Sequence, residues 1–538
     1  MAEIAPDPER TTSATTADSD RLHRTLDWKG GFWIASGVPA LVLFSIGSIA
    51  STVGAPSVMV WTISICFGLV QSFVWAEIAG LFPSKSGGAS VYGAMAWLRY
   101  SKFVAPVSVW CNWLAWSPVL MIGSSLAAGY VLTALFPADA VINTWSVTLV
   151  PLDFLQEGLG LQVSAQYVVA ALFLLLVFVL QHGGVLRAAR VQTIIGLAVL
   201  IPLLIIGVVP LVTGDVLRSN FMPFVPLNGS WDLSGWTLLA GGLFLAAWSA
   251  YAFETSICYT AEFRNPSRDT VRAILSAGLA CLVIYTLVPF AFQGVLGVQR
   301  LLEPGIVDGD GVGQAMTEIV GGGPVVGNLL IVMLVLALLL TIMTTMAGSS
   351  RTLYQGARDG WLPRYLSHAN KHGAPTRAMW TDLVFNLILL LFSDTVFILA
   401  SSTVCYMIFN FLNLNAGWMH RVDNAAAPRA YRAPTALIVA GTVLAFVNAL
   451  LLGWGASVWG GGGALWFGLI GAAIIIPVFA YRHYVQDRGS FPDTLYEDLP
   501  TAGGTRELVR RAGGKPYMVL AGGVLMVVIG QVLASVSG

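Results

Sequence analysis

The chain has 538 residues, of which 56% are hydrophobic and 10% charged, and its 28 basic residues balance 28 acidic ones. A soluble globular domain carries about 25% charged residues, so too few charges are present to cover a water-facing surface of this size. We therefore expect a lipid bilayer around most of the chain. A net charge of zero excludes the broad basic field that attracts nucleic acids.

Cysteine, histidine and nucleotide motifs exclude several other classes. The five cysteines lie inside apolar runs without a Cys-x-x-Cys pair, and the six histidines lie in polar stretches or at segment ends. This distribution predicts neither a disulfide framework nor a metal centre, and we expect no cofactor. The sequence contains no Gly-x-x-x-x-Gly-Lys-[Ser/Thr] motif, so ATP is not expected to drive the protein.

The chain opens with a polar stretch and continues with long apolar segments. Residues 1–30 lack the apolar core of a signal peptide, so we predict a disordered cytoplasmic tail. A helix needs about 20 apolar residues to cross a bilayer core of ~30 Å, and its backbone groups must pair internally there. Thirteen segments are candidates, although 378–393 is short and only Ser393–Asp394 separates it from the next. The predicted spans are 33–55, 57–82, 103–135, 164–181, 191–213, 235–258, 273–297, 325–349, 378–393, 396–419, 434–456, 464–481 and 516–536.

The basic residues orient these spans. With the N-terminus inside, Arg218 and Arg300 lie in outside loops, and the other 26 of the 28 lysines and arginines lie inside. This bias is typical of cytoplasmic loops, and it predicts a multi-pass protein of the plasma (inner) membrane with a cytoplasmic N-terminus. We assign a twelve-helix membrane domain to 31–482, a cytoplasmic loop to 483–515 and a further C-terminal span to 516–538.

Two spans that are five helices apart carry runs that interrupt an apolar helix. Residues 45–52 are small or hydroxyl-bearing, and residues 247–256 combine small residues, aromatic rings and a carboxylate. Interruptions at matching places of two halves point to a midplane solute site. Helix ends there offer N–H groups to anions and carbonyls to cations. For the first run, close helix packing through small residues is the alternative explanation.

Glu254 is the most informative single residue, because a carboxylate at mid-membrane is costly and usually functional. We expect it to hold a solute's ammonium group or to take up a proton; the alternative is a structural acid bonded to free backbone N–H groups. Trp248 and Tyr251 would add aromatic faces that attract cations, unless they only pack. We expect Glu77 to pair with cytoplasmic groups as a gate or fold element, and Asp382 to be structural.

Hydroxyl groups in the eighth span raise the question of a coupling ion. Thr341, Thr344 and Thr345 would place hydroxyls where Na⁺ meets first-span carbonyls, although back-bonding to their own helix is the commoner use of such groups. Both H⁺ and Na⁺ therefore stay as coupling hypotheses. The candidates for gating or proton coupling are Trp248, Glu254 and Glu77, and those for Na⁺ are Thr344 and Thr345.

Three stretches resemble the amino acid–polyamine–organocation (APC) superfamily of permeases, which have the leucine-transporter fold. The second span ends in AEIAGLFP at 76–83, followed by SGGASVY at 86–92. The sixth span exits through AEFRNP at 261–266, and SRTLYQGARDGWLP at 350–363 follows the eighth. The order and spacing of these motifs match the superfamily over about residues 31–482.

The resemblance implies an all-α bundle built as a five-plus-five inverted repeat with two further helices. It also implies that a solute carboxylate meets amides around 47–50 and that the amine meets carbonyls near 247–250. Trp248 and Glu254 have the spacing of the gating tryptophan and the functional glutamate in the related arginine–agmatine antiporter. The predicted substrate contacts are Gly47, Ser48, Ile49, Ala50, Ser51, Trp248, Ser249, Ala250, Tyr251 and Glu254.

Some residues depart from the superfamily pattern. The usual Gly-Ser-Gly of the first break reads Gly47-Ser48-Ile49, and Thr270-Val271 stands where a proline is common. No lysine lies in 191–213, so proton coupling through a lysine there is not expected. The short first break resembles the branch that carries choline and γ-aminobutyrate.

We therefore predict a secondary active permease for an amino acid or a related amine, working by alternating access around broken helices 1 and 6. The alternative solutes are choline, γ-aminobutyrate, ethanolamine or a polyamine. A transporter-like sensor that binds a solute without moving it is a further alternative, although residues 1–30 offer no signalling domain. An enzyme is not expected, because the spans carry only isolated acids, without histidine clusters or a lysine.

Overall fold

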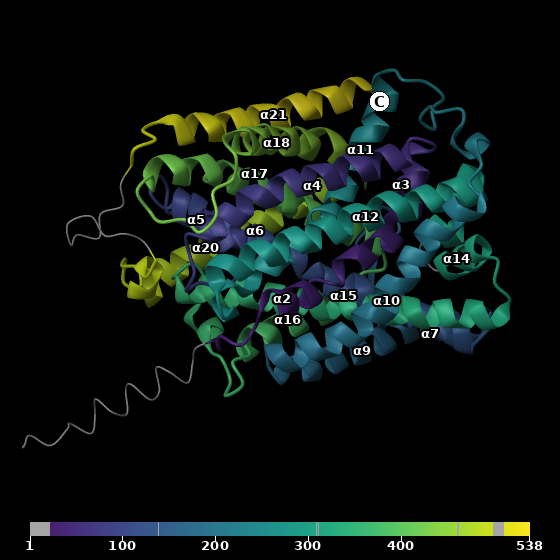
Figure 1. Cartoon of the computed structure of the whole chain (residues 1–538), viewed down its shortest axis with the longest axis horizontal. Helices are drawn as coiled ribbons and strands as arrows, with labels where there is room; N and C mark the ends of the chain where they lie inside the picture. The colour runs from purple at the N-terminus through teal and green to yellow at the C-terminus, as the bar shows by residue number, and fades with distance from the viewer. Residues whose placement is uncertain are drawn as a thin grey trace, which may run out of the picture.

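The chain is a bundle of long helices. The computed structural model describes residues 22–137, 139–307, 309, 311–459, 462–498 and 510–537. Within these residues, 12 helices are long and apolar enough to cross a membrane. The strands of the described part are β1 (Ser146–Pro151) and β2 (Gly160–Ser164), an antiparallel pair. Most helices run along the long axis of the molecule (Figure 1), and the prediction of a polytopic all-α membrane protein is confirmed.

The first half of the chain forms the first five spans and their connections. The first and third spans are each made of shorter helices in series, and Pro118 begins the second helix of the third span, where its missing N–H is tolerated. The helical elements are α2 (Trp28–Ile34), η1 (Val38–Leu41), α3 (Val42–Val53), α4 (Ser57–Ala79), α5 (Ala89–Trp97), α6 (Val104–Trp116), α7 (Pro118–Leu135), α8 (Val141–Thr144), α9 (Ala165–His182), α10 (Val185–Thr213) and η2 (Arg218–Phe221).

The second half also consists of long apolar helices joined by short turns. Its first span is an α-helix that continues as a 3-10 helix. The elements are α11 (Leu233–Ala250), η3 (Ala252–Glu262), α12 (Pro266–Leu301), α13 (Pro304–Val307), α14 (Val312–Val320), α15 (Pro324–Arg358), η4 (Arg364–Ser367), α16 (Thr376–Leu389), α17 (Thr395–Asp423), α18 (Thr435–Trp454), η5 (Gly455–Val458), α19 (Gly463–Ala473), α20 (Ile475–Ala480), the π-helical η7 (Tyr481–Gln486), η8 (Asp493–Tyr496) and α21 (Lys515–Ser537).

The predicted ninth span is short. Helix α16 has 14 residues, fewer than a straight crossing of the bilayer requires, and it packs against α7, α9 and α15. The Asp394 carboxylate accepts hydrogen bonds from the backbone N–H groups of Val396 (2.8 Å) and Phe397 (3.1 Å) and so caps α17. This cap separates α16 from α17 at the predicted boundary.

The helices form two packing groups. Contacts link α3, α4, α11 and α12 into a first group, whereas α7, α9, α15 and α16 all contact one another and form a second. Helix α10 packs against both α12 and α15 and so bridges the groups. The first group contains the two spans for which the sequence predicts interruptions.

The last helix, α21, packs along α18 at the edge of the bundle (Figure 1). Glycines make this contact close, because Gly453 faces the backbone of Val527 and Gly530 faces the backbone of Leu450. Gln531 Nε2 also donates to Gly453 O at 2.5 Å. Helix α21 is one of the 12 candidate spans by length and composition, and its crossing of the membrane stays a prediction.

Residues 22–30 are ordered, contrary to the prediction of a disordered tail over residues 1–30. The backbone N–H groups of Thr25 and Leu26 donate to Glu262 O at 2.9 and 3.0 Å. The Asp27 carboxylate caps α2 by accepting from Gly30 N at 2.8 Å. Backbone pairing with the end of η3 therefore fixes this segment, while residues 1–21 lie outside the described part of the chain.

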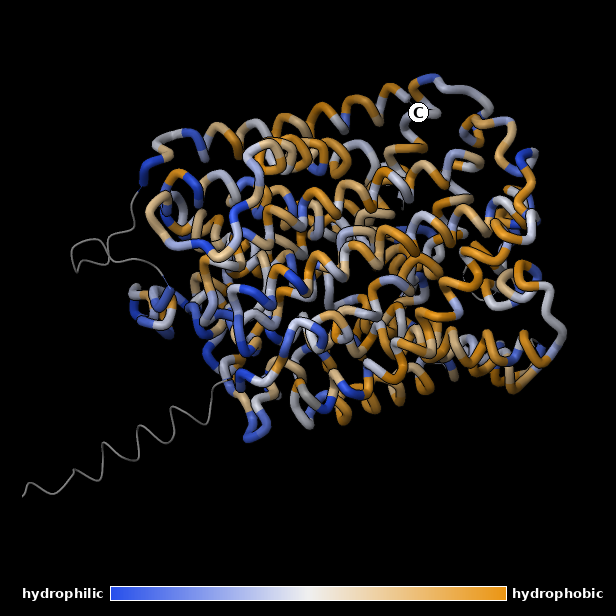
Figure 2. The backbone as a smooth tube through the Cα atoms, viewed as in Figure 1, coloured by the Kyte–Doolittle hydropathy of each residue, from blue (hydrophilic) through white to orange (hydrophobic). Residues whose placement is uncertain are grey.

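Hydrophilic residues gather at one end of the bundle, and hydrophobic residues dominate the helices between the two ends (Figure 2). We call this end the basic end; it holds the loops at residues 83–88, 359–375 and 487–498, which meet where Lys85 bonds both Asp359 and Thr494 O. We call the opposite end, which holds β1, β2, α13 and α14, the far end.

Tags at the two termini test the orientation. The basic end is expected to face the cytoplasm, and α21 is expected to return the chain to the other side. A C-terminal tag should therefore bind antibody on intact cells, whereas an N-terminal tag should bind only after permeabilisation. A tag in the loop at residues 359–375 is the internal control for the basic end. Protection of both terminal tags in intact cells would contradict a membrane-crossing α21.

Candidate functional site

The first span breaks between α2 and α3, at Ala35–Leu41. A turn and the 3-10 helix η1 replace the α-helix there. Pro39 has no N–H group to donate, which weakens the helix at this point. A Cβ atom at Gly37 would lie 2.7 Å from Thr344 Oγ1 and 2.8 Å from Leu340 O. Glycine therefore lets the broken segment lie directly against α15.

Hydroxyl groups of α15 donate to backbone carbonyls of the first break. Thr344 Oγ1 donates to Ile34 O at 2.7 Å, and Thr341 Oγ1 donates to Gly37 O at 3.0 Å. An unpaired carbonyl in the hydrocarbon core costs several kcal/mol. These two threonines therefore stabilise the break.

The predicted break at residues 45–52 is wrong, because these residues lie within the uninterrupted helix α3. Their small size serves packing instead. Gly47 lies against the backbone carbonyl of Ile306, where a Cβ atom has no room, and Ser48 Oγ donates to Val307 O at 3.1 Å. The helix-packing alternative therefore explains the run, which lets α13 rest on α3. The predicted contacts that lie on α3 and not at the break are Gly47, Ser48, Ile49, Ala50 and Ser51.

The predicted interruption of the sixth span is confirmed. Helix α11 ends at Ala250, and after Tyr251 the chain continues as the 11-residue 3-10 helix η3. Runs of 3-10 helix longer than three or four residues are uncommon, and such a stretch often marks a hinge. Gly68 of α4 makes room for the break, since a Cβ atom there would lie 2.6 Å from Ala250 O.

The hydroxyl of Tyr285, on α12, connects the two breaks. It lies 3.0 Å from Val38 O in the first break and 3.1 Å from Ser249 O in the sixth span. A tyrosine hydroxyl has one proton to donate, so the two carbonyls share a single donor. The predicted contact Ser249 therefore shares a donor with the observed first break.

Glu254 is buried on η3, just past the second break, with 3% of its surface exposed. Its Oε1 accepts from Trp116 Nε1 at 3.1 Å, Tyr406 Oη at 3.2 Å and Asn112 Nδ2 at 3.4 Å. Its Oε2 has no hydrogen-bond partner within the part of the chain that the structure describes. A buried polar atom left without a partner is unfavourable and needs an explanation.

Three further predicted residues surround the second break. Trp248 and Ala250 end α11 and are buried. The Tyr251 ring lies 6.2 Å from the ring of Tyr406. The structure therefore brings the predicted sixth-span residues together at the second break, and α11, which carries Trp248 and Ala250, also packs against α3.

Glu77 lies at the basic end of α4. Its carboxylate pairs with Arg421 at 2.6 Å and with Arg429, and it accepts a hydrogen bond from Ala433 N at 2.8 Å. These contacts tie α4 to the end of α17 and to the segment that follows. They fit the expected pairing of Glu77 with charged groups, and its role as a gate stays a prediction.

The eighth-span threonines face the first break, as the Na⁺ hypothesis requires, but Gln192 competes for the same oxygens. Gln192 Nε2 lies 3.2 Å from Ile34 O and 3.2 Å from Thr344 Oγ1. Thr345 Oγ1 is buried without a partner among the described residues. Because the Gln192 amide hydrogens already supply positive charge to these oxygens, the oxygens do not need a Na⁺ ion.

Most residues that reach the breaks from other spans carry no local signal in the sequence. Within the first break itself, Pro39 does carry such a signal, because a proline that follows Gly37 by two positions inside an apolar span marks a helix break. The others are ordinary polar residues of apolar helices until the fold brings them to the breaks. They are Asn112, Trp116, Gln192, Tyr285 and Tyr406.

Contacts close the basic end of the bundle. Arg351 of α15 forms a buried ion pair with Glu262 of η3, with 2.9 Å between Nη2 and Oε2. Lys85 Nζ pairs with Asp359 at 2.6 Å. The Gly87 backbone N–H donates to Cys258 O on η3 at 2.9 Å. The half of the sixth span that follows the break is therefore tied to α15 and to the loop at residues 83–88.

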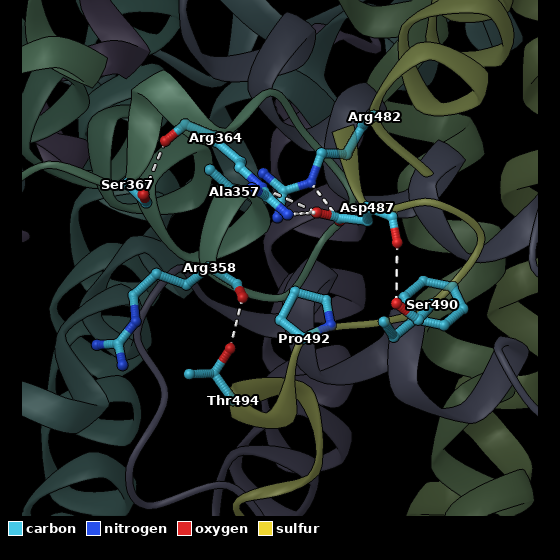
Figure 3. A pocket seen from close by; sticks show the side chains of 10 residues that line it. Ala357, Arg358, Arg364, Ser367, Arg482, Asp487, Ser490, Pro492 and Thr494 are labelled. Carbon is cyan, nitrogen blue, oxygen red and sulfur yellow. Dashed lines mark hydrogen bonds and ion pairs between the residues drawn. The ribbon is translucent and has the colours of Figure 1, made fainter. Parts of the chain in front are cut away.

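Two cavities lie at the ends of the bundle and do not reach the breaks. One of about 430 Å³ opens at the basic end between α15, η4 and residues 482–494. Figure 3 shows Arg364 and Arg482 of this cavity converging on Asp487, so both guanidinium groups are already paired. The other, of about 320 Å³, lies at the far end and is lined by uncharged residues of α7, α9 and β2, among others. At the second break, Ser249, Tyr251 and Glu254 are buried.

A polytopic bundle with two spans broken at matching places, and a buried carboxyl beside one break, is the architecture of a membrane carrier. The sequence profile of the amino acid permease family matches residues 26–480. The chain belongs to the amino acid permease family, whose members are transporters.

The individual relatives have low sequence identity to this chain, but the matches cover most of it. The branched-chain amino acid permease BcaP of Lactococcus lactis subsp. cremoris is 23% identical over 472 residues, which cover 84% of this chain and 93% of that protein. A putative arginine/ornithine antiporter of Bacillus subtilis is 25% identical, covering 72% of this chain and 83% of its own. The putrescine transporter PotE of Escherichia coli is 20% identical, covering 62% and 67%.

Replacing Gly37 tests the position of the first break. An added Cβ atom would lie within 2.8 Å of the α15 backbone, so Gly37→Ala should lower the free energy of unfolding by about 1–3 kcal/mol, as overpacking does. The melting temperature of the purified protein in detergent measures this loss. Gly323→Ala is the matched control, because no atom lies within 4 Å of its added Cβ. Equal melting temperatures for the two variants would contradict a close approach of Gly37 to α15.

Proposed function

We propose that this permease is a secondary active transporter of an amino acid or a related amine across the plasma membrane, working by alternating access around the two breaks. The observation that carries the proposal is the Glu254 carboxyl, which is buried beside the second break with one oxygen unpaired among the described residues. The names of relatives, which state branched-chain amino acid and putrescine transport, support a solute that bears an amine.

Glu254 needs a positive partner when it is ionised. Its hydrogen-bond partners among the described residues are neutral donors on α6 and α17, and a buried carboxylate without a cation is strongly unfavourable. A proton and a solute's ammonium group can each neutralise it, and at Oε2 they exclude each other. The same carboxyl therefore links the movement of the solute to the movement of a proton.

The second break supplies the remaining contacts of an ammonium group. The C-terminal end of α11 carries partial negative charge, and Trp248 and Tyr251 offer aromatic faces beside it. An ammonium that takes Ser249 O leaves the single Tyr285 proton to Val38 O. Binding then removes the shared donor that joins the two breaks, which frees them to move relative to each other.

Opening toward the basic end requires the contacts around η3 to separate. The Arg351–Glu262 ion pair joins α15 of the second packing group to the end of η3. When that end opens, Arg351 and Glu262 separate, and water hydrates each of them. Glu77 and its arginine partners, on α17 and the following segment, form a second set of contacts at the same end, and we propose that they gate it.

A solute without an α-carboxylate is the second candidate. Anion binding at a helix break relies on free backbone N–H groups, and Pro39 removes one of them from the first break. The carbonyls there are turned toward hydroxyl donors. The first break therefore favours an amine whose recognition depends on Glu254 more than on a bound carboxylate, as in ethanolamine, choline, γ-aminobutyrate or a polyamine.

Uptake into proteoliposomes tests the proposal. A panel of radiolabelled amino acids and amines should contain at least one solute whose uptake falls about ten- to hundredfold in Glu254→Gln. This range corresponds to the loss of a charge-assisted hydrogen bond of about 1.5–3 kcal/mol. Comparison of α-amino acids with amines that lack an α-carboxylate separates the two candidates.

The control for this experiment is Glu318→Gln, which removes a carboxylate from an exposed pair with Arg300 at the far end. Surface pairs of this kind contribute about 0–1 kcal/mol, so its uptake should match the unaltered protein. Uptake at full rate by Glu254→Gln, or no uptake and no thermal shift with any solute of the panel, would refute the proposed function.

A further inference from the structure

One face of α6 serves Glu254. Asn112 Nδ2 and Trp116 Nε1 donate to Glu254 Oε1 at 3.4 and 3.1 Å. Residues four apart in sequence lie on the same helix face, so both donors point from α6 toward η3. Thr352 Oγ1 donates to Asn112 Oδ1 at 3.1 Å and so fixes which side of the amide faces the carboxyl. The rotation of α6 therefore controls two of the three donors to Glu254.

The adjacent face of α6, one residue further along, serves Asp382 on α16. Trp113 Nε1 and Ser117 Oγ donate to Asp382 Oδ1 at 2.6 and 2.9 Å, and Ser349 Oγ of α15 donates to Oδ2 at 2.7 Å. The carboxyl is fully buried. Asp382 therefore joins the last turn of α6 to α15 and α16.

Asn386, one turn after Asp382, completes this clamp at the junction of α6 and α7. Its Nδ2 donates to Ser117 Oγ at 2.9 Å, and its Oδ1 accepts from Met121 N at 3.1 Å. The Ser117 hydroxyl thus donates to Asp382 and accepts from Asn386, which both lie on α16. Helix α16 therefore bonds residues on both sides of the junction at which Pro118 begins α7.

We propose that Asp382 is a positioning residue for Glu254. It holds the α6 turn Trp113–Ser117 in one rotation, and that rotation aims the donors on the neighbouring face at the Glu254 carboxyl. This inference rests on the proposed function, in which Glu254 exchanges a proton for an ammonium group. The sequence expectation that Asp382 is structural assigns it a purely scaffolding role, and the two roles give different results below.

Loss of this positioning has a defined direction. Donors that reach Glu254 stabilise its ionised form, so misaiming them moves its protonation midpoint to higher pH. The direct effect of removing a negative charge at Asp382 has the opposite sign and moves the midpoint to lower pH. The titratable groups facing Glu254 are Tyr406 of α17 and Cys258 of η3; Glu262, further along η3, is paired with Arg351 of α15. The hydrogen-bond partners of the Asp382 carboxyl among the described residues are the neutral donors of α6 and α15.

Asp382→Asn is the first test variant, because an amide keeps the shape but offers one acceptor oxygen in place of two. The full-length protein in proteoliposomes is titrated by infrared difference spectroscopy, and the carboxyl band that disappears in Glu254→Gln reports the protonation of Glu254. We expect the midpoint of this band to rise by about one pH unit, which corresponds to the loss of roughly one hydrogen bond.

Further variants separate positioning from loss of folding. Ser349→Ala removes the α15 donor without changing charge or touching α6, and it should shift the midpoint in the same direction, by less. Trp116→Phe removes a donor to Glu254 itself and should shift it as Asp382→Asn does. Asp153→Asn is the matched control, because Asp153 lies in an exposed loop at the far end and bonds Gly158 N.

Two outcomes overturn the inference, and they differ from a failure of the proposed function. An unchanged or lowered midpoint in Asp382→Asn and Ser349→Ala, together with a raised one in Trp116→Phe, refutes positioning by Asp382 and leaves the role of Glu254 standing. The absence of any titrating Glu254 band in the unaltered protein refutes proton exchange at Glu254, and the inference with it. If Asp382→Asn does not fold, the Ser349→Ala midpoint decides the question.

Discussion

The arrangement of this permease depends on one constraint, which is that a carbonyl released from a helix inside lipid must find another donor. At the first break the donors are Thr341 and Thr344 of α15, and Tyr285 of α12 serves a third carbonyl while also reaching the second break. The donors come from both packing groups. The contacts that stabilise the breaks therefore also join the two packing groups. A change at either break alters contacts between the groups.

The buried acids of the chain differ in how completely they are paired. At the basic end, Glu77, Glu262 and Asp359 each have a basic partner. Asp382 has three neutral donors, whereas Glu254 keeps one oxygen without a partner among the described residues. Buried ion pairs hold loops and helix ends in place. Within the same residues, Asp359 also keeps one oxygen without a partner, but its other oxygen is paired with Lys85. Among these acids of the described part of the chain, Glu254 is thus distinguished by combining an unpaired oxygen with neutral partners alone.

The sequence predicts the helical spans and the sixth-span break well, because both depend on local composition. Apolar length alone reveals the spans, and a carboxylate among small and aromatic residues in 247–256 is conspicuous. The first break is misplaced because the run at 45–52 contains more small residues than the true break, where Gly37 and Pro39 are the only marks. Small residues serve both breaks and close packing, so composition does not separate the two uses; the contact of Gly47 with α13 does.

The partners of the breaks follow from tertiary packing and not from any motif. Asn112 and Trp116 become donors to Glu254 only because α6 turns one face toward η3, and that turn depends on α16, more than 260 residues later in the chain. Trp113 and Ser117 lie one position further along the helix than Asn112 and Trp116, yet they bind a different acid. If Asp382 positions this turn as we propose, the geometry at one carboxyl sets the hydrogen bonds of the other. Two faces of a single helix are then enough to couple α16 to η3.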